Sequence, residues 1–266
     1  MVAVVIALGL AFGLKTDPQT DLTFLSVGQG DCTVFRTQGL TLLVDVGPED
    51  AGQRLVVPAL RKMGVASLDL VLLSHPDADH IGGLAAVARR FRIGKVVIPA
   101  SFRTHPDMVA TLKAARIPAE QVLWLSGPNN ARFGDFELET DSVPWAEGLP
   151  DNDGSMFVRL KGGNATATFS GDASETAENL MEMPHDWGAQ ILHTGHHGSS
   201  SSTSYGWIRE VHPKWAIVSC GRDNAYGHPA PDTIKRLADL QVPVLRTDRE
   251  GTIRFTVGPN GFELAR

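Results

Sequence analysis

Cysteine is scarce in this 266-residue sequence, which contains only Cys32 and Cys220. They lie far apart and form no CxxC pair, so the sequence offers neither a zinc knuckle nor a disulfide scaffold. We expect two small buried side chains, with a single disulfide as the alternative. Positive charge is also scarce, since 24 Lys and Arg face 30 Asp and Glu and the formal net charge is −6. No global basic field therefore draws the chain to nucleic acid or anionic lipid.

One apolar stretch is out of character with the rest of the chain. Met1–Leu14 carries no charge, but at about 1.5 Å per residue it is short for a membrane core of ~30 Å. It also lacks the positive leader of a signal peptide. We expect residues 1–21 to be a membrane-helix remnant or anchor followed by a linker, with a buried N-terminal element as the alternative. The remaining residues, 22–266, are predicted to form one domain.

Within that domain, strand-like and helix-like runs alternate. Leu22–Val27, Thr33–Thr37 and Leu40–Val46 predict strands, and Leu55–Met63 predicts an amphipathic helix ended by glycine. Alternating strands and helices follow to the end of the chain, with no internal repeat. This order predicts the α/β class, with sheets inside and helices outside.

The chain is organised around Ser74–Gly83, which reads SHPDADHIGG. It lies between the apolar run Leu68–Leu73 and the helix-forming run Leu84–Arg90. Imidazole and carboxylate groups at this spacing point together only around something positive, so the loop predicts one or two divalent metals. A helix cap is the alternative, but a cap needs one carboxylate and no histidine. The predicted metal ligands of this loop are His75, Asp77, Asp79 and His80.

Other acidic and imidazole side chains follow further predicted strands, each beside a glycine. If these loops share one edge of the sheets, they form a single site. Asp172 taken alone is equally compatible with a helix N-cap. Because adjacent side chains of a regular strand point oppositely, we expect one of His196 and His197 to be a ligand and the other an acid, an orienting group or a substrate contact. The strand-end residues are Asp31, Asp172, His196, His197 and His228.

Several other polar residues lack such a context. His105, His185 and His212 are predicted to lie on the surface. One local basic cluster could track a DNA backbone, although a solvated helix face is the simpler interpretation. This basic cluster consists of Arg89, Arg90, Arg92 and Lys95.

The motifs VGQGD, SHPDADHIGG, FSGD, TGHHGS and SCGRDNAYGHPAPDTIKRL, in this order, resemble the metallo-β-lactamase-fold domain of ComEC-type competence proteins. The resemblance covers about residues 22–255. It implies a metallo-β-lactamase fold, a four-layer αββα sandwich. It also implies attachment to a polytopic membrane protein that imports single-stranded DNA, with the domain on the extracytoplasmic side. The implied partners are DNA and the membrane-embedded channel or the rest of such a protein, and the domain itself is expected to be monomeric.

The resemblance also assigns residues. The HxHxDH signature of the wider superfamily falls on His75, Asp77, Asp79 and His80, with Asp77 in place of the second histidine. Asp172 falls on the metal-bridging aspartate, and His196 or His197 on a downstream histidine. Asp151–Ser155 lacks the histidine that is usual in that region. Carboxylate in place of imidazole makes Mn²⁺ more plausible relative to Zn²⁺, with Mg²⁺ also possible.

The expected function is therefore a metal-dependent nuclease that cleaves DNA by attack of a metal-bound hydroxide. Asp79 lies at the centre of the chemistry, with His197 or His228 as the proton donor or phosphate contact. Asp31 and Ser199 are expected to contact substrate. The alternatives are a small-molecule ester, lactam or thioester hydrolase of the same fold and a non-catalytic DNA-guiding module with decayed metal sites.

Overall fold

The structure, a computed structural model, describes residues 20–144, 148–181 and 186–265. Met1–Leu14 and His185 lie outside these ranges, and so do the predictions made for them. Among the described residues, no helix combines the length and the apolar character needed to cross a membrane.

One sheet contains eight described strands in the order β15-β14-β1-β2-β3-β4-β5-β6. From β3 to β6 the strands pair in parallel, and the other pairs are antiparallel. The strands are Asp21–Phe24 (β1), Thr33–Thr37 (β2), Leu40–Val44 (β3), Ser67–Leu72 (β4), Arg92–Pro99 (β5), Val122–Leu125 (β6), Ile253–Gly258 (β14) and Gly261–Leu264 (β15).

The second sheet contains seven described strands in the order β13-β12-β11-β10-β9-β8-β7. From β10 to β13 the pairing is parallel, and from β7 to β10 it is antiparallel. The strands are Asn129–Phe133 (β7), Phe136–Ser142 (β8), Met156–Gly162 (β9), Ala165–Phe169 (β10), Ile191–His193 (β11), Trp215–Val218 (β12) and Val244–Arg246 (β13).

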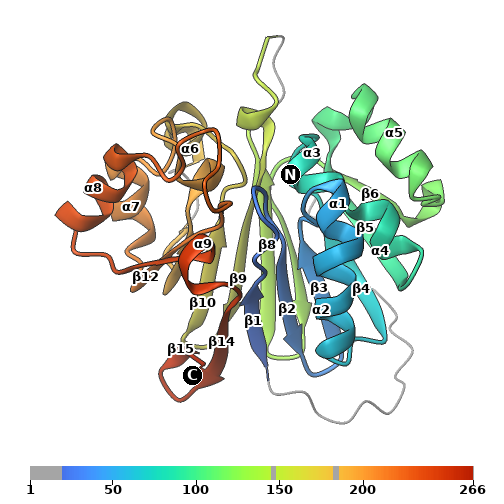
Figure 1. Cartoon of the computed structure of the whole chain (residues 1–266), viewed down its shortest axis with the longest axis horizontal. Helices are drawn as coiled ribbons and strands as arrows, with labels where there is room; N and C mark the ends of the chain where they lie inside the picture. The colour runs from blue at the N-terminus through green and yellow to red at the C-terminus, as the bar shows by residue number, and fades with distance from the viewer. Residues whose placement is uncertain (1–19, 145–147, 182–185, 266) are drawn as a thin grey trace.

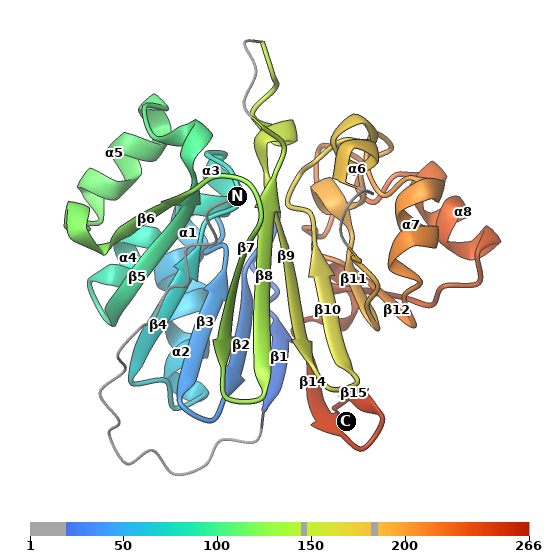
Figure 2. The same cartoon turned by 180° about the vertical axis from the view of Figure 1, so that it is seen from behind.

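Helices cover the outer face of each sheet. Helices α1–α5 lie on one side of the molecule and α6–α8 on the other (Figures 1 and 2). One π-helical turn, Gly52–Val56, joins α1 to α2. The helices are Glu49–Ala51 (α1), Val57–Lys62 (α2), Ala78–Ile81 (α3), Leu84–Ala88 (α4), Pro106–Ala114 (α5), Glu175–Met181 (α6), Tyr205–Val211 (α7), Pro231–Asp239 (α8) and Thr247–Glu250 (α9).

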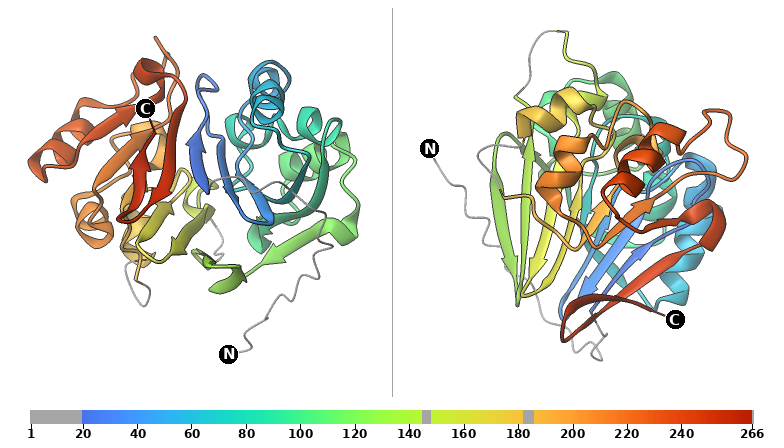
Figure 3. Two further views of the ribbon diagram at one scale, coloured as in Figure 1. Left: turned by 90° about the horizontal axis from the view of Figure 1, so that it is seen from below. Right: turned by 90° about the vertical axis from the view of Figure 1, so that its left-hand side faces the viewer.

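Three apolar cores hold the four layers together. The sheets pack face to face through residues such as Phe24, Leu42 and Phe169, and each sheet packs separately against its own helices. The layers are visible from below in Figure 3. β3 reads LTLLV and is buried along its whole length, because a central strand of this sandwich meets the other sheet on one face and helices on the other. The predicted α/β class and the αββα metallo-β-lactamase fold are confirmed.

Some expected elements differ in detail. Strand β3 ends at Val44 and not at Val46, because Asp45 takes a left-handed conformation with φ of 57°. The edge strands β7 and β15 were not predicted, because their polar residues and glycines carry little apolar alternation. Cys32 and Cys220 are both buried and free, which confirms the expectation of two small buried side chains.

The basic cluster lies away from the strand end that is followed by the SHPDADHIGG segment. Arg92 pairs with Ser67 at the start of β4, whereas this segment follows Leu72 at the end of β4. Lys95 donates a hydrogen bond to the carbonyl of Glu120. This placement favours the interpretation of the cluster as a solvated face, because its charges lie at the opposite end of the sheet.

Candidate metal centre

The SHPDADHIGG segment joins β4 to α4, as expected from the sequence, but it contains the short helix α3, which carries Asp79 and His80. His75 and His80 are fully buried, whereas the Asp77 and Asp79 side chains are 47% and 32% exposed. Gly83 is required where the loop enters α4, because a Cβ there would lie 2.1 Å from the Val46 carbonyl oxygen. The loop is thus packed tightly against the end of β3, with two imidazoles inside and two carboxylates facing outward.

A left-handed turn presents two more imidazoles. His196 and His197 have φ values of 49° and 54°, within a 3-10 turn spanning Gly195–Gly198 after β11. The premise of alternating strand side chains is therefore wrong, because neither residue lies in a strand. Both rings reach Asp172, with Nε2 to Oδ2 distances of 3.6 Å for His196 and 3.7 Å for His197. Two consecutive left-handed non-glycine residues are strained by roughly 1–3 kcal/mol each, which is typical of functional sites.

Asp31 reaches the same place from the other sheet. Its backbone N–H donates to the Asp79 carbonyl at 3.2 Å, in the loop between β1 and β2. Gly30 has a φ of 133°, and a Cβ on it would lie 2.3 Å from that same carbonyl oxygen. The second glycine of the VGQGD motif, Gly30, therefore allows this loop to lie against the backbone of Asp79. The Asp31 carboxylate lies 3.2 Å from Nδ1 of His197.

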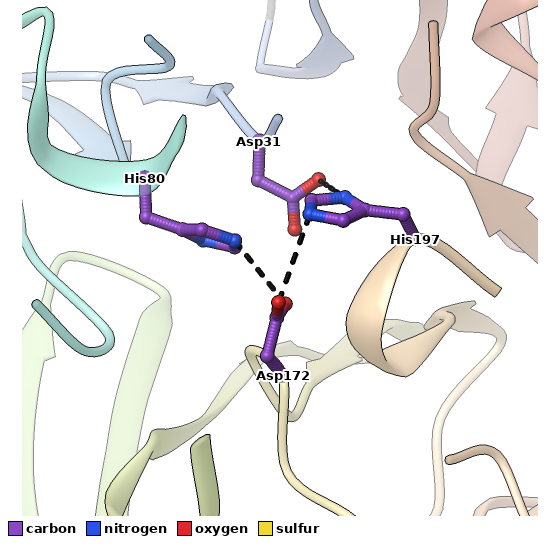
Figure 4. Close-up of side chains that lie close together, drawn as sticks. All are labelled: Asp31, His80, Asp172 and His197. Atoms are coloured by element: carbon purple, nitrogen blue, oxygen red, sulfur yellow. Dashed lines mark ion pairs between the residues drawn. The ribbon is translucent and has the colours of Figure 1, made fainter. Parts of the chain in front are cut away.

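Asp172 is the centre of the cluster. Its carboxylate oxygens lie 3.2 Å from Nε2 of His80 and 3.8 Å from Nε2 of His75, in addition to the two imidazoles of the left-handed turn. Figure 4 shows Asp31, His80, Asp172 and His197 converging from four separate segments. These four buried residues each offer one ligand atom, and the four atoms lie within 4.8 Å of one another. We call these four residues the central cluster.

The outer nitrogens of three imidazoles are held by hydrogen bonds. Nδ1 of His80 lies 2.9 Å from Asp45, Nδ1 of His75 lies 3.0 Å from Oγ of Ser74, and Nδ1 of His197 lies 3.1 Å from the Ser219 carbonyl. Asp45 in turn accepts from both the backbone N–H and the hydroxyl of Ser74 at 2.8 Å. Such contacts fix each ring and leave Nε2 aimed inward, as in metal-ligating histidines.

Asp45 and His193 belong to this arrangement, although neither was a sequence candidate. His193 is buried at the end of β11, with Nε2 2.9 Å from Oγ of Ser219 and Nδ1 3.6 Å from Asp31. Its ring stacks on Phe24 at 5.4 Å. Both residues resemble ordinary strand-end residues in the sequence. The position of Asp45 directly after a largely apolar strand was the one available signal.

The charges of the central cluster depend on one another. Burial alone would raise the pKa of Asp172, but the imidazoles of His80, His197 and His75 outweigh it and hold that pKa well below its usual value. Burial alone would lower the pKa of His80, but Asp172 and Asp45 raise it well above its usual value. Protons on the imidazoles thus balance the buried carboxylates, and a divalent cation bound by these groups would replace those protons.

A metal ion fits the residues present. Several inward-facing buried atoms have no hydrogen-bond partner among the described residues: Nε2 of His75, Nε2 of His80, Oδ1 of Asp31 and Oδ1 of Asp172. An unsatisfied buried polar group costs about 1–3 kcal/mol, so these atoms are best explained as ligands. Mixed imidazole and carboxylate donors suit Zn²⁺, Mn²⁺ or iron.

A family model described as the Metallo-beta-lactamase superfamily matches residues 25–222. The chain belongs to the metallo-beta-lactamase superfamily. It is 32% identical over 247 residues to Competence protein ComA of Neisseria gonorrhoeae, with 92% of this chain and 33% of that protein covered. It is 27% identical over 260 residues to ComE operon protein 3 of Bacillus subtilis (strain 168), with 91% of this chain and 33% of that protein covered.

The chain thus spans about a third of the length of these curated relatives. Among solved structures, the metallo-beta-lactamase fold protein YhfI from Bacillus subtilis superposes with a TM-score of 0.57 at 12% identity, with 89% of this chain and 100% of that chain covered. The predicted resemblance to competence proteins is confirmed. The chain is a metallo-beta-lactamase superfamily hydrolase with competence-protein homologues and an Asp/His cluster that could hold metal.

The other site residues predicted from the sequence surround the central cluster and differ in how far they are exposed to solvent. Asp79 lies 3.0 Å from Nε2 of His197, and Asp77 lies 3.6 Å from Nε2 of His75. His228 is partly buried, with its ring 5.5 Å from that of His196. Burial and the neighbouring His197 and His196 lower the pKa of His228. Ser199 is turned into the loop, where its hydroxyl pairs with Ser201, so a substrate contact by Ser199 stays a prediction.

Three residues outside the site also bear on the predictions made from sequence. His105 is 22% exposed, and its Nε2 lies 3.1 Å from Asp151. A sequence pattern could not show this pair, because the partners are 46 residues apart. His212 is exposed, as expected. The Asp153 carboxylate accepts a hydrogen bond from the backbone N–H of Ser174, next to the start of α6.

A buried glutamate fixes the loop that follows the left-handed turn. Glu178 on α6 accepts hydrogen bonds from the backbone N–H groups of Thr203 at 2.6 Å and Ser204 at 2.9 Å. Thr203 in turn accepts from the Gly195 N–H at 3.0 Å through its hydroxyl. Burial raises the pKa of Glu178 from 4.5 to about 7, although the two backbone N–H groups oppose the shift.

This raised pKa predicts a pH-dependent stability. Between pH 4.5 and about 7 the folded chain holds a proton on Glu178 that the unfolded chain has released. The free energy of unfolding should therefore decline as pH rises through this window, by up to about 3 kcal/mol. Glu178→Gln should flatten that decline, as measured by urea unfolding from pH 5 to 8. Glu175→Gln, at an exposed position on the same helix, is the control. Parallel profiles for the wild type and Glu178→Gln would contradict the assignment.

Proposed function

We propose that this domain is a metal-dependent deoxyribonuclease that hydrolyses DNA phosphodiester bonds during competence-linked DNA uptake. One observation carries the proposal: a buried cluster suited to metal opens to solvent through partly exposed acidic and imidazole side chains. Asp77, Asp79 and His196 are 47%, 32% and 30% exposed, although each lies within 4 Å of a buried member of the site. A polymer backbone can approach groups that are exposed in this way.

The residues divide into two candidate ligand sets that share Asp172. Asp31, His80 and His197 would hold one ion together with Asp172, with Asp79 beside it. His75 and Asp77 would hold a second ion. Divalent ions bound here would supply an activated water at neutral pH and positive charge against the phosphate oxygens. Asp45, Ser74 and the Ser219 carbonyl keep the imidazole Nε2 atoms directed inward, and His196 and His228 line the solvent side, where a phosphate would lie.

A small-molecule hydrolase is the second candidate. It needs an enclosed, largely apolar pocket at the reacting groups. A cavity of about 330 Å³ is lined instead by residues of β7–β9 and by Asp186 and Trp187, on a different part of the molecule. The cavity that does lie at the candidate metal centre, next to Asp31 and Ser74, has a volume of about 10 Å³ and is too small for a substrate. These volumes favour the polymer substrate.

A decayed, non-catalytic module is the third candidate. Loss of metal binding removes the advantage of keeping buried imidazole and carboxylate atoms that form no hydrogen bond, because burial of such groups destabilises the fold. The retention of four of them in this chain favours a working site.

The deciding experiment is a nuclease assay of the full chain in detergent, with Mn²⁺, Zn²⁺, Mg²⁺ and EDTA in parallel. We expect cleavage of single-stranded or duplex DNA with at least one ion and none with EDTA, as followed by gel electrophoresis of end-labelled strands. Cleavage of a lactam or thioester without DNA cleavage would favour the small-molecule hydrolase. Tight single-strand binding without any turnover would favour the non-catalytic module.

The setting is proposed from the same relatives. The competence names of the relatives suggest a membrane-associated context. We further propose that the domain lies on the extracytoplasmic side, is monomeric, and has DNA and a membrane-embedded channel as partners. Protease accessibility of the domain in intact cells tests the side, and protection from external protease would count against it.

A further inference from the structure

The loop between β12 and α8 carries a solvent-exposed aromatic side chain, Tyr226, near the candidate metal centre. The Tyr226 side chain is 72% exposed, more than any other large hydrophobic residue described as exposed. The others are aliphatic: Leu55, Val109, Leu180 and Leu264. A large ring left in solvent gains little from folding, so its position is not explained by the core.

The ring belongs to a ladder that ends at the metal centre. Tyr226 stacks on His228 with ring centroids 5.8 Å apart and an interplanar angle of 25°. The His228 ring lies 5.5 Å from that of His196 and 6.3 Å from that of His197. His197 contacts both Asp79 and Asp172. The Tyr226 ring is therefore connected to the central cluster through the ring of His228.

The loop is held by several hydrogen bonds. The Asn224 side-chain amide donates to the carbonyls of Gly221 at 2.9 Å and His228 at 2.6 Å, and its oxygen accepts from the His228 N–H. Outside the loop, the Gly221 N–H donates to Gln29 and the Ala230 N–H donates to the Gly198 carbonyl. The ring is thus positioned before any ligand arrives, which lowers the entropy lost on binding.

We propose that Tyr226, backed by His228, is a stacking platform for one unpaired nucleobase of the strand that is cleaved. This inference rests on the proposed nuclease function. An aromatic ring accepts any base on its face, at roughly 1–3 kcal/mol per base. The base must have a free face, and inside a duplex both faces are covered by neighbouring bases. The platform therefore selects single strands and strand ends over duplex interiors.

The test compares the wild-type full chain with Tyr226→Ala and Tyr226→Phe on a dT12 oligonucleotide, in the metal that supports cleavage. Tyr226→Ala should lower kcat/KM about 5- to 140-fold, mainly through KM, while Tyr226→Phe stays within about twofold of the wild type. On a dT12 analogue whose central residues are abasic, the ratio of wild type to Tyr226→Ala should shrink several-fold. Val109→Ala, at an exposed apolar position on α5, is the matched control.

Equal kcat/KM for the wild type and Tyr226→Ala on dT12 would overturn the platform and leave the nuclease intact. A wild type that cleaves no DNA with any ion would overturn the nuclease. In that case, the anisotropy of labelled dT12 decides the platform, because Tyr226→Ala must still weaken binding several-fold. An unchanged ratio on the abasic strand would also overturn the platform, because the ring would then act without a base.

Discussion

Replacement of Asp172 by Asn is expected to lower phosphodiesterase kcat/KM about 1,000-fold and to reduce the bound metal. The Asp172 carboxylate lies 3.2–3.8 Å from Nε2 atoms of His75, His80, His196 and His197, more imidazoles than any other acidic group described here contacts. Asn keeps the shape but loses the negative charge shared by both candidate ligand sets. A loss of this size corresponds to about 4 kcal/mol of transition-state stabilisation.

Steady-state cleavage of a labelled oligonucleotide and elemental analysis of the same preparation measure the two effects together. Circular dichroism should show a folded Asp172→Asn variant, because the backbone contact of Asp172 with the Ser155 hydroxyl does not involve its carboxylate. A folded variant with full metal content and near wild-type turnover would refute the central place of Asp172.

Replacement of Asp79 by Asn should also reduce activity by roughly three orders of magnitude, with folding largely intact. Asp79 is partly exposed at a strand end, so its carboxylate contributes little to the core, but it lies 3.0 Å from Nε2 of His197. Asp77→Asn is the comparison. We expect a smaller loss, because Asp77 contacts His75 at 3.6 Å from the more exposed side of the loop. Initial rates for both variants at several metal concentrations separate weaker metal binding from slower chemistry.

The control for this series is His212→Asn. His212 is exposed, and its left-handed conformation, with φ of 53°, is one that Asn tolerates. His105→Ala is a poorer control, because it would break the pair with Asp151. Equal rates for Asp77→Asn and Asp79→Asn would mean that the two carboxylates hold metal equivalently, contrary to the geometry.

The sequence by itself determined the class of fold and the position of the first ligands. Strand-length apolar runs followed by helix formers placed His75, Asp77, Asp79 and His80 in one segment between β4 and α4. This deduction is local, because the spacing of a strand, a loop and a helix depends on neighbours within a few residues. The glycines beside Asp31 and Asp172 likewise marked strand-end loops before their geometry was known. The order of five motifs then identified the superfamily.

Only the tertiary structure decided which groups meet. His197 and Asp79 are separated by 118 residues, and their contact depends on the order of strands in two sheets, which local patterns do not encode. The left-handed turn that aims both His196 and His197 at Asp172 contradicts the strand geometry expected from the sequence. The roles of Asp45 and His193 as hydrogen-bonding partners of the site could not be predicted for the same reason. Their buried hydrogen bonds join the ends of β3 and β4 and of β11 and β12, which are distant in the chain, so these bonds exist only after the sheets have assembled.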